Sequence, residues 1–155
     1  MDDLVHIGLS CTKNYLIHVI EVINSLVTAC SNYKYVVHIV VDCSEIETKS
    51  IKSLLDSFGI ENINFFVYSS ICFEHYIEKN KSKVRMDLSK MTYARLFLDA
   101  FLAPDIERIL WLEADLLITN NRVSNLFDMP FDDCYAIGVV DPSIMAFRKD
   151  EMNNT

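Results

Sequence analysis

The sequence predicts an α/β fold in which a mostly parallel sheet is flanked by helices. Short apolar runs rich in β-branched residues alternate with longer segments at helical spacing, in the order strand, helix, strand, helix, strand. The second of these runs, YVVHIVV, is apolar almost throughout, as expected of a strand covered on both faces. A chain of 155 residues with 51% hydrophobic and 23% charged residues suits one globular domain, here residues 1–155.

The first half of the chain gives the clearest element predictions. Strands are expected at residues 4–10, 35–41 and 63–68. Between the first two, residues 14–30 place apolar side chains on one helical face: Leu16, Val19, Ile20, Ile23, Leu26, Val27 and Cys30. Ser44 and Glu47 have the spacing of a capping box, and Gly59 lies just past the helix that this box begins.

The second half is less regular. We expect a short helix at 73–80, a helix from the cap Ser89 to about Leu102 that stops before Pro104, and a helical turn at 123–127. Further strands are expected at 107–112 and 135–140. The basic stretch 79–85 is interpreted as a solvated loop, with contact to an anionic acceptor or a membrane surface as the alternative.

Composition excludes several classes of function. With 14 basic and 22 acidic residues the net charge is -8, which argues against nucleic-acid binding. The three glycines, Gly8, Gly59 and Gly138, lie too far apart for a glycine-rich phosphate loop. There is no apolar run of about 18 residues and the chain begins Met-Asp-Asp, so we expect a cytoplasmic protein whose membrane contact, if any, is peripheral.

The five cysteines are widely spaced and contain no CxxC pair. They are Cys11, Cys30, Cys43, Cys72 and Cys134. Zinc ligands or disulfides are one interpretation of these residues. We favour the other, that they are small buried apolar residues of a protein in a reducing compartment.

Two carboxylates follow the expected strand 107–112. Ligands of open parallel sheets bind outside the carboxyl ends of the strands, where Glu113 and Asp115 stand. In extended chain, residues i and i+2 point to the same side, so the two groups would share a small volume. A hard divalent cation such as Mn²⁺ or Mg²⁺ would relieve their repulsion. Plain turn or cap residues are the alternative interpretation of this pair.

The segment 89–96 (SKMTYARL), followed by an apolar strand and Glu113-Ala114-Asp115, resembles glycosyltransferase family 8. These are retaining enzymes that include lipopolysaccharide galactosyl- and glucosyltransferases and the glycogenins. The first strand followed by Lys13-Asn14-Tyr15 is similar to that family's nucleotide-binding start, and the resemblance extends from Val5 to about Asp141. It implies a nucleotide-diphospho-sugar transferase (GT-A-like) fold.

The resemblance also implies roles for single residues. Glu113 and Asp115 would hold Mn²⁺ (or Mg²⁺), with Ala114 between them beside the donor, and Arg95 would contact the diphospho-sugar as a catalytic residue. Tyr15 would stack on uracil, while Ser10, Thr12 and Asn14 would line the base and ribose pocket. Asp141 is a candidate for contact with the sugar. The alternatives are that Tyr15 only packs and that Arg95 pairs with Asp99, four residues on.

Two departures from the family pattern bear on function. Glu113 stands where the family usually has Asp, and nothing after Asp141 supplies the acceptor site and metal-binding histidine of the family's second half. The leading hypothesis is the donor-binding half of a retaining enzyme that moves a hexose from a UDP-hexose to a saccharide or glycolipid acceptor of the lipopolysaccharide type. The alternative is a catalytically inactive fragment that binds a nucleotide or a partner.

Overall fold

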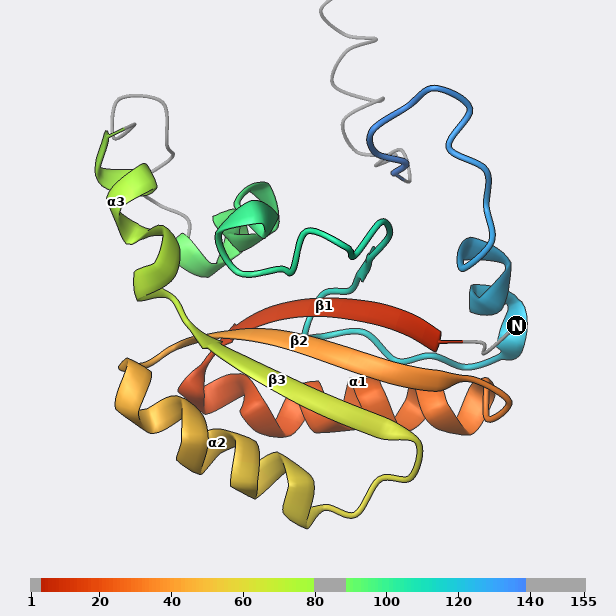
Figure 1. Cartoon of the computed structure of the whole chain (residues 1–155). Helices are drawn as coiled ribbons and strands as arrows, with labels where there is room; N and C mark the ends of the chain where they lie inside the picture. The colour runs from red at the N-terminus through yellow and green to blue at the C-terminus, as the bar shows by residue number, and fades with distance from the viewer. Residues whose placement is uncertain (1–3, 80–88, 139–155) are drawn as a thin grey trace, which may run out of the picture.

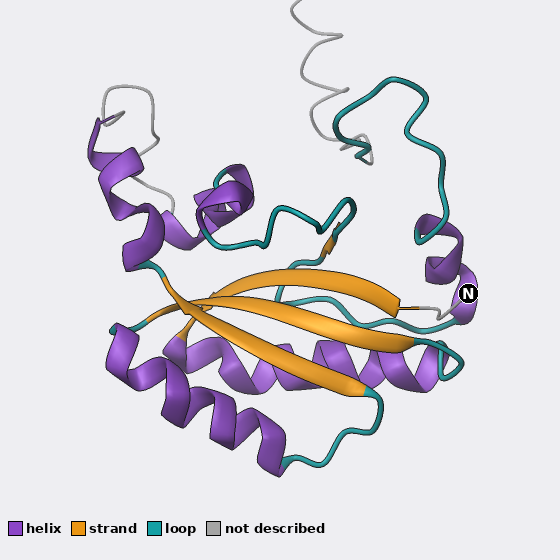
Figure 2. Ribbon diagram, in the orientation of Figure 1, coloured by secondary structure: helices purple, strands orange, loops and turns teal. Residues whose placement is uncertain are grey.

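The computed structural model describes residues 4–79 and 89–138 and contains a four-stranded parallel sheet. The strands are β1 (Leu4–Thr12), β2 (Lys34–Asp42), β3 (Ile63–Ser69) and β4 (Leu110–Trp111). Their order across the sheet is β3-β2-β1-β4, and every neighbouring pair is parallel (Figure 2). The predicted fold class is therefore confirmed, as is the neighbourhood of the first four predicted strands.

Two long helices cover one face of the sheet. Helix α1 (Leu16–Ala29) and helix α2 (Glu45–Ser57) lie together below the sheet in Figure 1. Their apolar faces bury the side chains that alternate along the central strands, such as Ile7, Val37 and Ile39, all with no exposed surface. The predicted capping box is confirmed, since the amide of Ser44 donates to Oε2 of Glu47 over 2.8 Å. Gly59, with φ +62°, follows this helix as expected.

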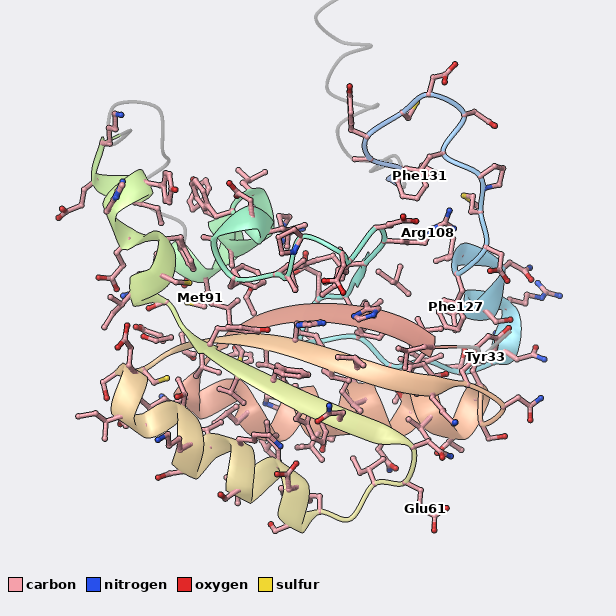
Figure 3. All side chains as sticks on the ribbon, in the orientation of Figure 1. Tyr33, Glu61, Met91, Arg108, Phe127 and Phe131 are labelled. Atoms are coloured by element: carbon pink, nitrogen blue, oxygen red, sulfur yellow. The ribbon has the colours of Figure 1, made fainter. Side chains whose placement is uncertain are left out.

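The connection from β3 to β4 crosses the opposite face. It contains α3 (Ile71–Lys79) and two 3₁₀ segments, η3 (Lys90–Leu96) and η4 (Leu98–Ala100), which lie above the sheet in Figure 1. A second, smaller core forms there from Val40, Phe73, Met91 and Ala94. Met91 of η3 is buried in this core and faces the sheet (Figure 3).

The predicted single helix from Ser89 to about Leu102 is wrong. Ser89 does cap the segment, because its Oγ accepts from the amide of Met91 over 3.3 Å. The carbonyl of Met91, however, accepts a hydrogen bond from Oγ of Ser10 on β1 over 2.7 Å. This tie to the strand, together with the low helix propensity of Thr92 and Tyr93, favours short 3₁₀ turns over a continuous α-helix.

Strand β4 is short because it pairs with β1 over only two residues, Ile7 with Leu110 and Gly8 with Trp111. The amide of Leu112 adds a further bond to the carbonyl of Gly8, over 2.9 Å. A Cβ on Gly8 would lie 2.6 Å from the Trp111 ring, so only glycine lets that ring lie over β1.

The chain after β4 contains a 3₁₀ segment, η5 (Asn121–Leu126), where the helical turn at 123–127 was predicted. The guanidinium of Arg108 donates to the carbonyls of Phe127 (2.7 Å) and Met129 (2.9 Å) (Figure 3). Phe127 in turn packs edge-on against Tyr33, with ring centroids 4.9 Å apart.

The fifth predicted strand is wrong over its described part. Residues 135–138 form no strand, and residues 139–141, including Asp141, lie outside the described residues. Asp132 and Asp133 have φ of 42° and 67°, a left-handed turn that breaks the extended chain just before the apolar run. The β-branched composition of the run was a misleading signal, since a strand also needs a neighbour to pair with.

Three of the five cysteines are buried as predicted, namely Cys11, Cys30 and Cys43, whereas Cys72 and Cys134 are exposed. All five are free thiols. Burial raises the pKa of Cys11 to about 12, so this thiol stays protonated within the core. Across residues 4–79 and 89–138, no helix is long and apolar enough to cross a membrane.

Candidate functional site

The carboxyl end of β1 supplies the first group of predicted site residues. Cys11 points into the core between the sheet and α1. Its neighbours Ser10 and Thr12 on β1 therefore point to the opposite face of the sheet. The chain then turns through η1 (Lys13–Tyr15), which leaves Asn14 and Tyr15 exposed. Tyr15 is 52% exposed as a residue, and the centroid of its ring lies 5.2 Å from that of His18. Tyr15 is thus outside the core and open to a planar ligand.

Arg95 and Glu113 meet at this edge of the sheet. Nη2 of Arg95 lies 2.5 Å from Oε1 of Glu113. Nε of the same guanidinium donates to the carbonyl of Thr92 over 3.2 Å, and its Cζ lies 6.0 Å from the centroid of the Trp111 ring. The carboxylate partner of Arg95 is therefore Glu113, which follows β4, and not Asp99 on η4.

Asp115 follows Glu113 in a turn, and it is Glu113 that contacts Arg95. Residues 114–115 form a turn, so the extended-chain argument that Glu113 and Asp115 point to the same side does not hold. Asp115 and Ala114 line a hollow of about 300 Å³ together with Leu116, Leu117, and His18 and Glu21 of α1. Glu113 thus contacts the 3₁₀ segment above the sheet, whereas Asp115 borders the helix below it.

Lys90 is a site-forming residue that sequence reasoning missed. Its Nζ lies 3.0 Å from Oδ1 of Asp42, at the end of β2, and 2.7 Å from Oε1 of Glu74 on α3. The hydrogen bond to Glu74, followed by that to Asp42, raises the pKa of Lys90. These two ion pairs hold the start of η3, the segment that carries Arg95. Its place inside the SKMTYARL segment was the available signal.

A second ion pair ties η1 to α2 on the other side of β1. Nζ of Lys13 contacts Oε1 of Glu47, and Oε2 of the same carboxylate accepts hydrogen bonds from the amide and the hydroxyl of the capping residue Ser44. These bonds, that of Lys13 first, lower the pKa of Glu47 to about 2. The loop of Asn14 and Tyr15 is thereby anchored at Lys13.

The chemistry of the carboxylates suits a hard divalent cation. Glu113 and Asp115 offer the oxygen ligands that Mn²⁺ and Mg²⁺ prefer. Within the described ranges 4–79 and 89–138, no three His, Cys, Asp or Glu side chains gather as a metal-binding group. Oε1 of Glu113 already contacts Arg95, and Asp141 lies outside the described residues.

The chain forms an open parallel α/β sheet with the strand order 3-2-1-4 and polar groups at its carboxyl edge, which is where sheets of this class bind their ligands. More narrowly, the family model of glycosyl transferase family 8 matches residues 6–155. The chain belongs to this family.

Solved structures share the fold. A structure of the galactosyltransferase LgtC in complex with donor and acceptor sugar analogues is 22% identical with a TM-score of 0.60, as is a structure of an LgtC active-site mutant. The match covers 83% of this chain and 44% of LgtC. The apo structure of the bifunctional glycosyltransferase WbbM is 22% identical with a TM-score of 0.55, covering 84% of this chain and 22% of WbbM. The chain thus spans less than half of either relative. A comparison with curated proteins gives no match.

Proposed function

We propose that residues 1–155 form the donor-binding domain of a retaining hexosyltransferase that uses a UDP-hexose. The acceptor would be a saccharide or a glycolipid of the lipopolysaccharide type. The observation that carries this proposal is the Arg95–Glu113 pair, which joins the SKMTYARL segment to the end of β4 at the carboxyl edge of the sheet. The five free thiols favour a reducing compartment such as the cytoplasm, where the protein would lie near the inner face of a membrane.

Different residues at the carboxyl edge of the sheet would bind different parts of the donor. Tyr15, exposed beside the end of β1, would stack on the uracil ring, and base stacking of this kind contributes about 1–3 kcal/mol. Asn14 and Thr12 offer polar groups to the base and ribose. Ser10, whose hydroxyl already donates to Met91, would shape the floor of the pocket. Arg95 would bind the diphosphate through its planar fork of N–H donors and stabilise the charge on the departing UDP.

Glu113 and Asp115 would hold Mn²⁺ or Mg²⁺, which supplies Lewis acidity and orients the diphosphate. Arg95 and Asp141 are the residues we assign to catalysis, Asp141 through contact with the sugar. Ala114, between the two carboxylates, would bring backbone polar groups to the donor.

The test is nucleotide binding by isothermal titration calorimetry in Mg²⁺. UDP should bind more tightly than GDP, CDP or ADP, and Arg95→Ala should weaken UDP at least tenfold, since it removes a bidentate charge-assisted contact. Arg122→Ala, which removes an exposed arginine on η5, is the matched control and should bind as the wild type. Equal UDP affinity in Arg95→Ala and the wild type would contradict the proposal that the diphosphate binds at this edge of the sheet.

An inactive binding fragment is the second candidate. The observation that favours it is that Glu113, a proposed ligand of the cation, has Arg95 as its partner in the structure. Nucleotide binding without any hydrolysis of UDP-hexose in Mn²⁺ would support this candidate, whereas metal-dependent hydrolysis would exclude it.

A further inference from the structure

An ion pair lies beside the end of β1, where the proposed function places the base of the donor. Asp42 ends β2 and is the register partner of Thr12, the last residue of β1. The two side chains lie on the same face of the sheet, because the residues before them, Cys11 and Val41, both belong to the core on the helix-covered face. Nζ of Lys90 lies 3.0 Å from Oδ1 of Asp42.

Lys90 is held close to the same strand end by its neighbour. The carbonyl of Met91 accepts a hydrogen bond from Oγ of Ser10 on β1 over 2.7 Å, on the face that Thr12 shares. The start of η3 therefore lies against the end of β1. A carboxylate from β2 and an ammonium from η3 thus stand next to each other at the base pocket.

Both charged groups keep capacity for a ligand. The ammonium of Lys90 has three N–H donors, and its contacts with Asp42 and with Oε1 of Glu74, the latter over 2.7 Å, engage two of them. Among the described residues, the contacts of Asp42 with Lys90 and with the hydroxyl of Ser70 fall on Oδ1, which leaves Oδ2 as an acceptor. The Lys90 and Asp42 side chains are 36% and 44% exposed, so a ligand can reach both.

We propose that the Asp42–Lys90 pair recognises the hydrogen-bonding edge of the base and selects uracil over cytosine. Uracil presents an N3–H donor beside its O4 carbonyl, whereas cytosine presents an N3 acceptor beside its N4 amine. The carboxylate can only accept hydrogen bonds and the ammonium can only donate them. Uracil therefore matches the pair, and cytosine would place an acceptor against the carboxylate and a donor against the ammonium. The inference rests on the proposed function of the site.

The test compares UDP with CDP by isothermal titration calorimetry in Mg²⁺. The two nucleotides share the ribose and the diphosphate, so the ratio of their dissociation constants reports on the base alone. The wild type should prefer UDP by about tenfold or more, the effect of one hydrogen bond to a charged group. Asp42→Asn keeps the size of the side chain and adds an N–H donor that can pair with N3 of cytosine. It should weaken UDP, tighten CDP and abolish most of the preference.

Glu74→Gln is the matched control. It also removes one negative charge from a partner of Lys90, but Glu74 lies on α3 and not at the end of a strand. If the two carboxylates served only to hold η3, Asp42→Asn and Glu74→Gln would weaken UDP and CDP alike. We expect instead that Glu74→Gln keeps the wild-type ratio. Asp42→Ser, whose hydroxyl both donates and accepts, is a second variant that should lose the preference, and thermal melts without nucleotide show which variants are folded.

The outcomes separate this recognition from the proposed function. A wild-type preference for UDP that survives in Asp42→Asn and Asp42→Ser would overturn the recognition and keep the donor site. An equal loss of the preference in Glu74→Gln would overturn it too. Equal binding of UDP and CDP by the wild type, with both weakened in Arg95→Ala, would keep the diphosphate site alone. If the wild type binds neither nucleotide, the proposed function fails and the recognition fails with it.

Discussion

Replacing Gly8 with Ala should destabilise the protein and disturb the candidate site together. Gly8 pairs with Trp111, and an added Cβ would lie 2.6 Å from Cε3 of that ring and 2.8 Å from Cδ1 of Ile109. Both distances are below any normal contact, so β4 has to shift or the ring has to rotate. Overpacking of this kind costs about 1–3 kcal/mol.

For a domain of this size, each kcal/mol lowers the melting temperature by roughly 2–4 °C. The assay is urea unfolding followed by tryptophan fluorescence, because Trp111 is the single tryptophan and lies at the perturbed position. Glu113 follows Trp111 by two residues, so the same variant should also bind UDP more weakly.

The matched control is Gly138→Ala, since a Cβ there meets nothing within 4 Å. It should unfold at the wild-type urea concentration. A Gly8→Ala protein with unchanged midpoint and unchanged UDP affinity would refute the argument that β4 is positioned by the close approach of Trp111 to β1.

Three further predictions follow. Burial, and then the neighbouring His6, lowers the pKa of His38 to about 4, below the 6.5 of the unfolded chain. The free energy of unfolding should therefore decrease by roughly 1–3 kcal/mol as the pH falls from 6.5 toward 4, because the unfolded chain binds the proton first. Chemical denaturation across pH 4–7 measures this decrease, and an equally steep decrease in His38→Leu would contradict it. Ser44→Ala should lower the free energy of unfolding by about 1 kcal/mol through loss of the capping box, whereas exposed Ser53→Ala on the same helix should cost less, and equal losses in a thermal melt would argue against the cap. Residues 1–155 alone should bind the donor yet transfer no hexose to saccharide or glycolipid acceptors. They match only 44% of LgtC, and positioning of an acceptor accounts for ~7–11 kcal/mol of the barrier to such a transfer. Mn²⁺-dependent transfer from radiolabelled UDP-hexoses would disprove this.

The sequence predicts the first half of the fold well because its signals there are local and consistent. The apolar runs of β1 and β2, the helical face of α1 and the Ser44–Glu47 box each specify one structure, and all agree with a βαβ crossover. In the second half of the chain, the sequence-based predictions are wrong where tertiary contacts determine the local structure. Ser10 binding the Met91 carbonyl and the left-handed turn at Asp132 and Asp133 leave no trace in hydrophobic periodicity.

The site shows the same division. Motif spacing brings Arg95 and Glu113 to one edge of the sheet, because a strand end and a preceding segment suffice to place them. It does not predict that Glu113 pairs with Arg95, that Asp115 lines a hollow beside α1, or that Lys90 contacts Asp42 and Glu74. Those contacts depend on which face of the sheet each side chain lies on. A turn of two residues is enough to move a side chain from one face to the other.

We expect the donor to bind at the carboxyl edge of β1 and β4. The most direct measurement is a titration of isotope-labelled protein with UDP in Mg²⁺, followed by two-dimensional amide spectra. We expect the largest shifts at Ser10 to Tyr15, around Arg95 and at Glu113 to Asp115. A second hollow of about 350 Å³, lined by Glu45, Thr48, Tyr68 and Phe101 among others, offers the contrasting result. Shifts confined to that hollow, with the β1 and β4 edge unmoved, would contradict the account.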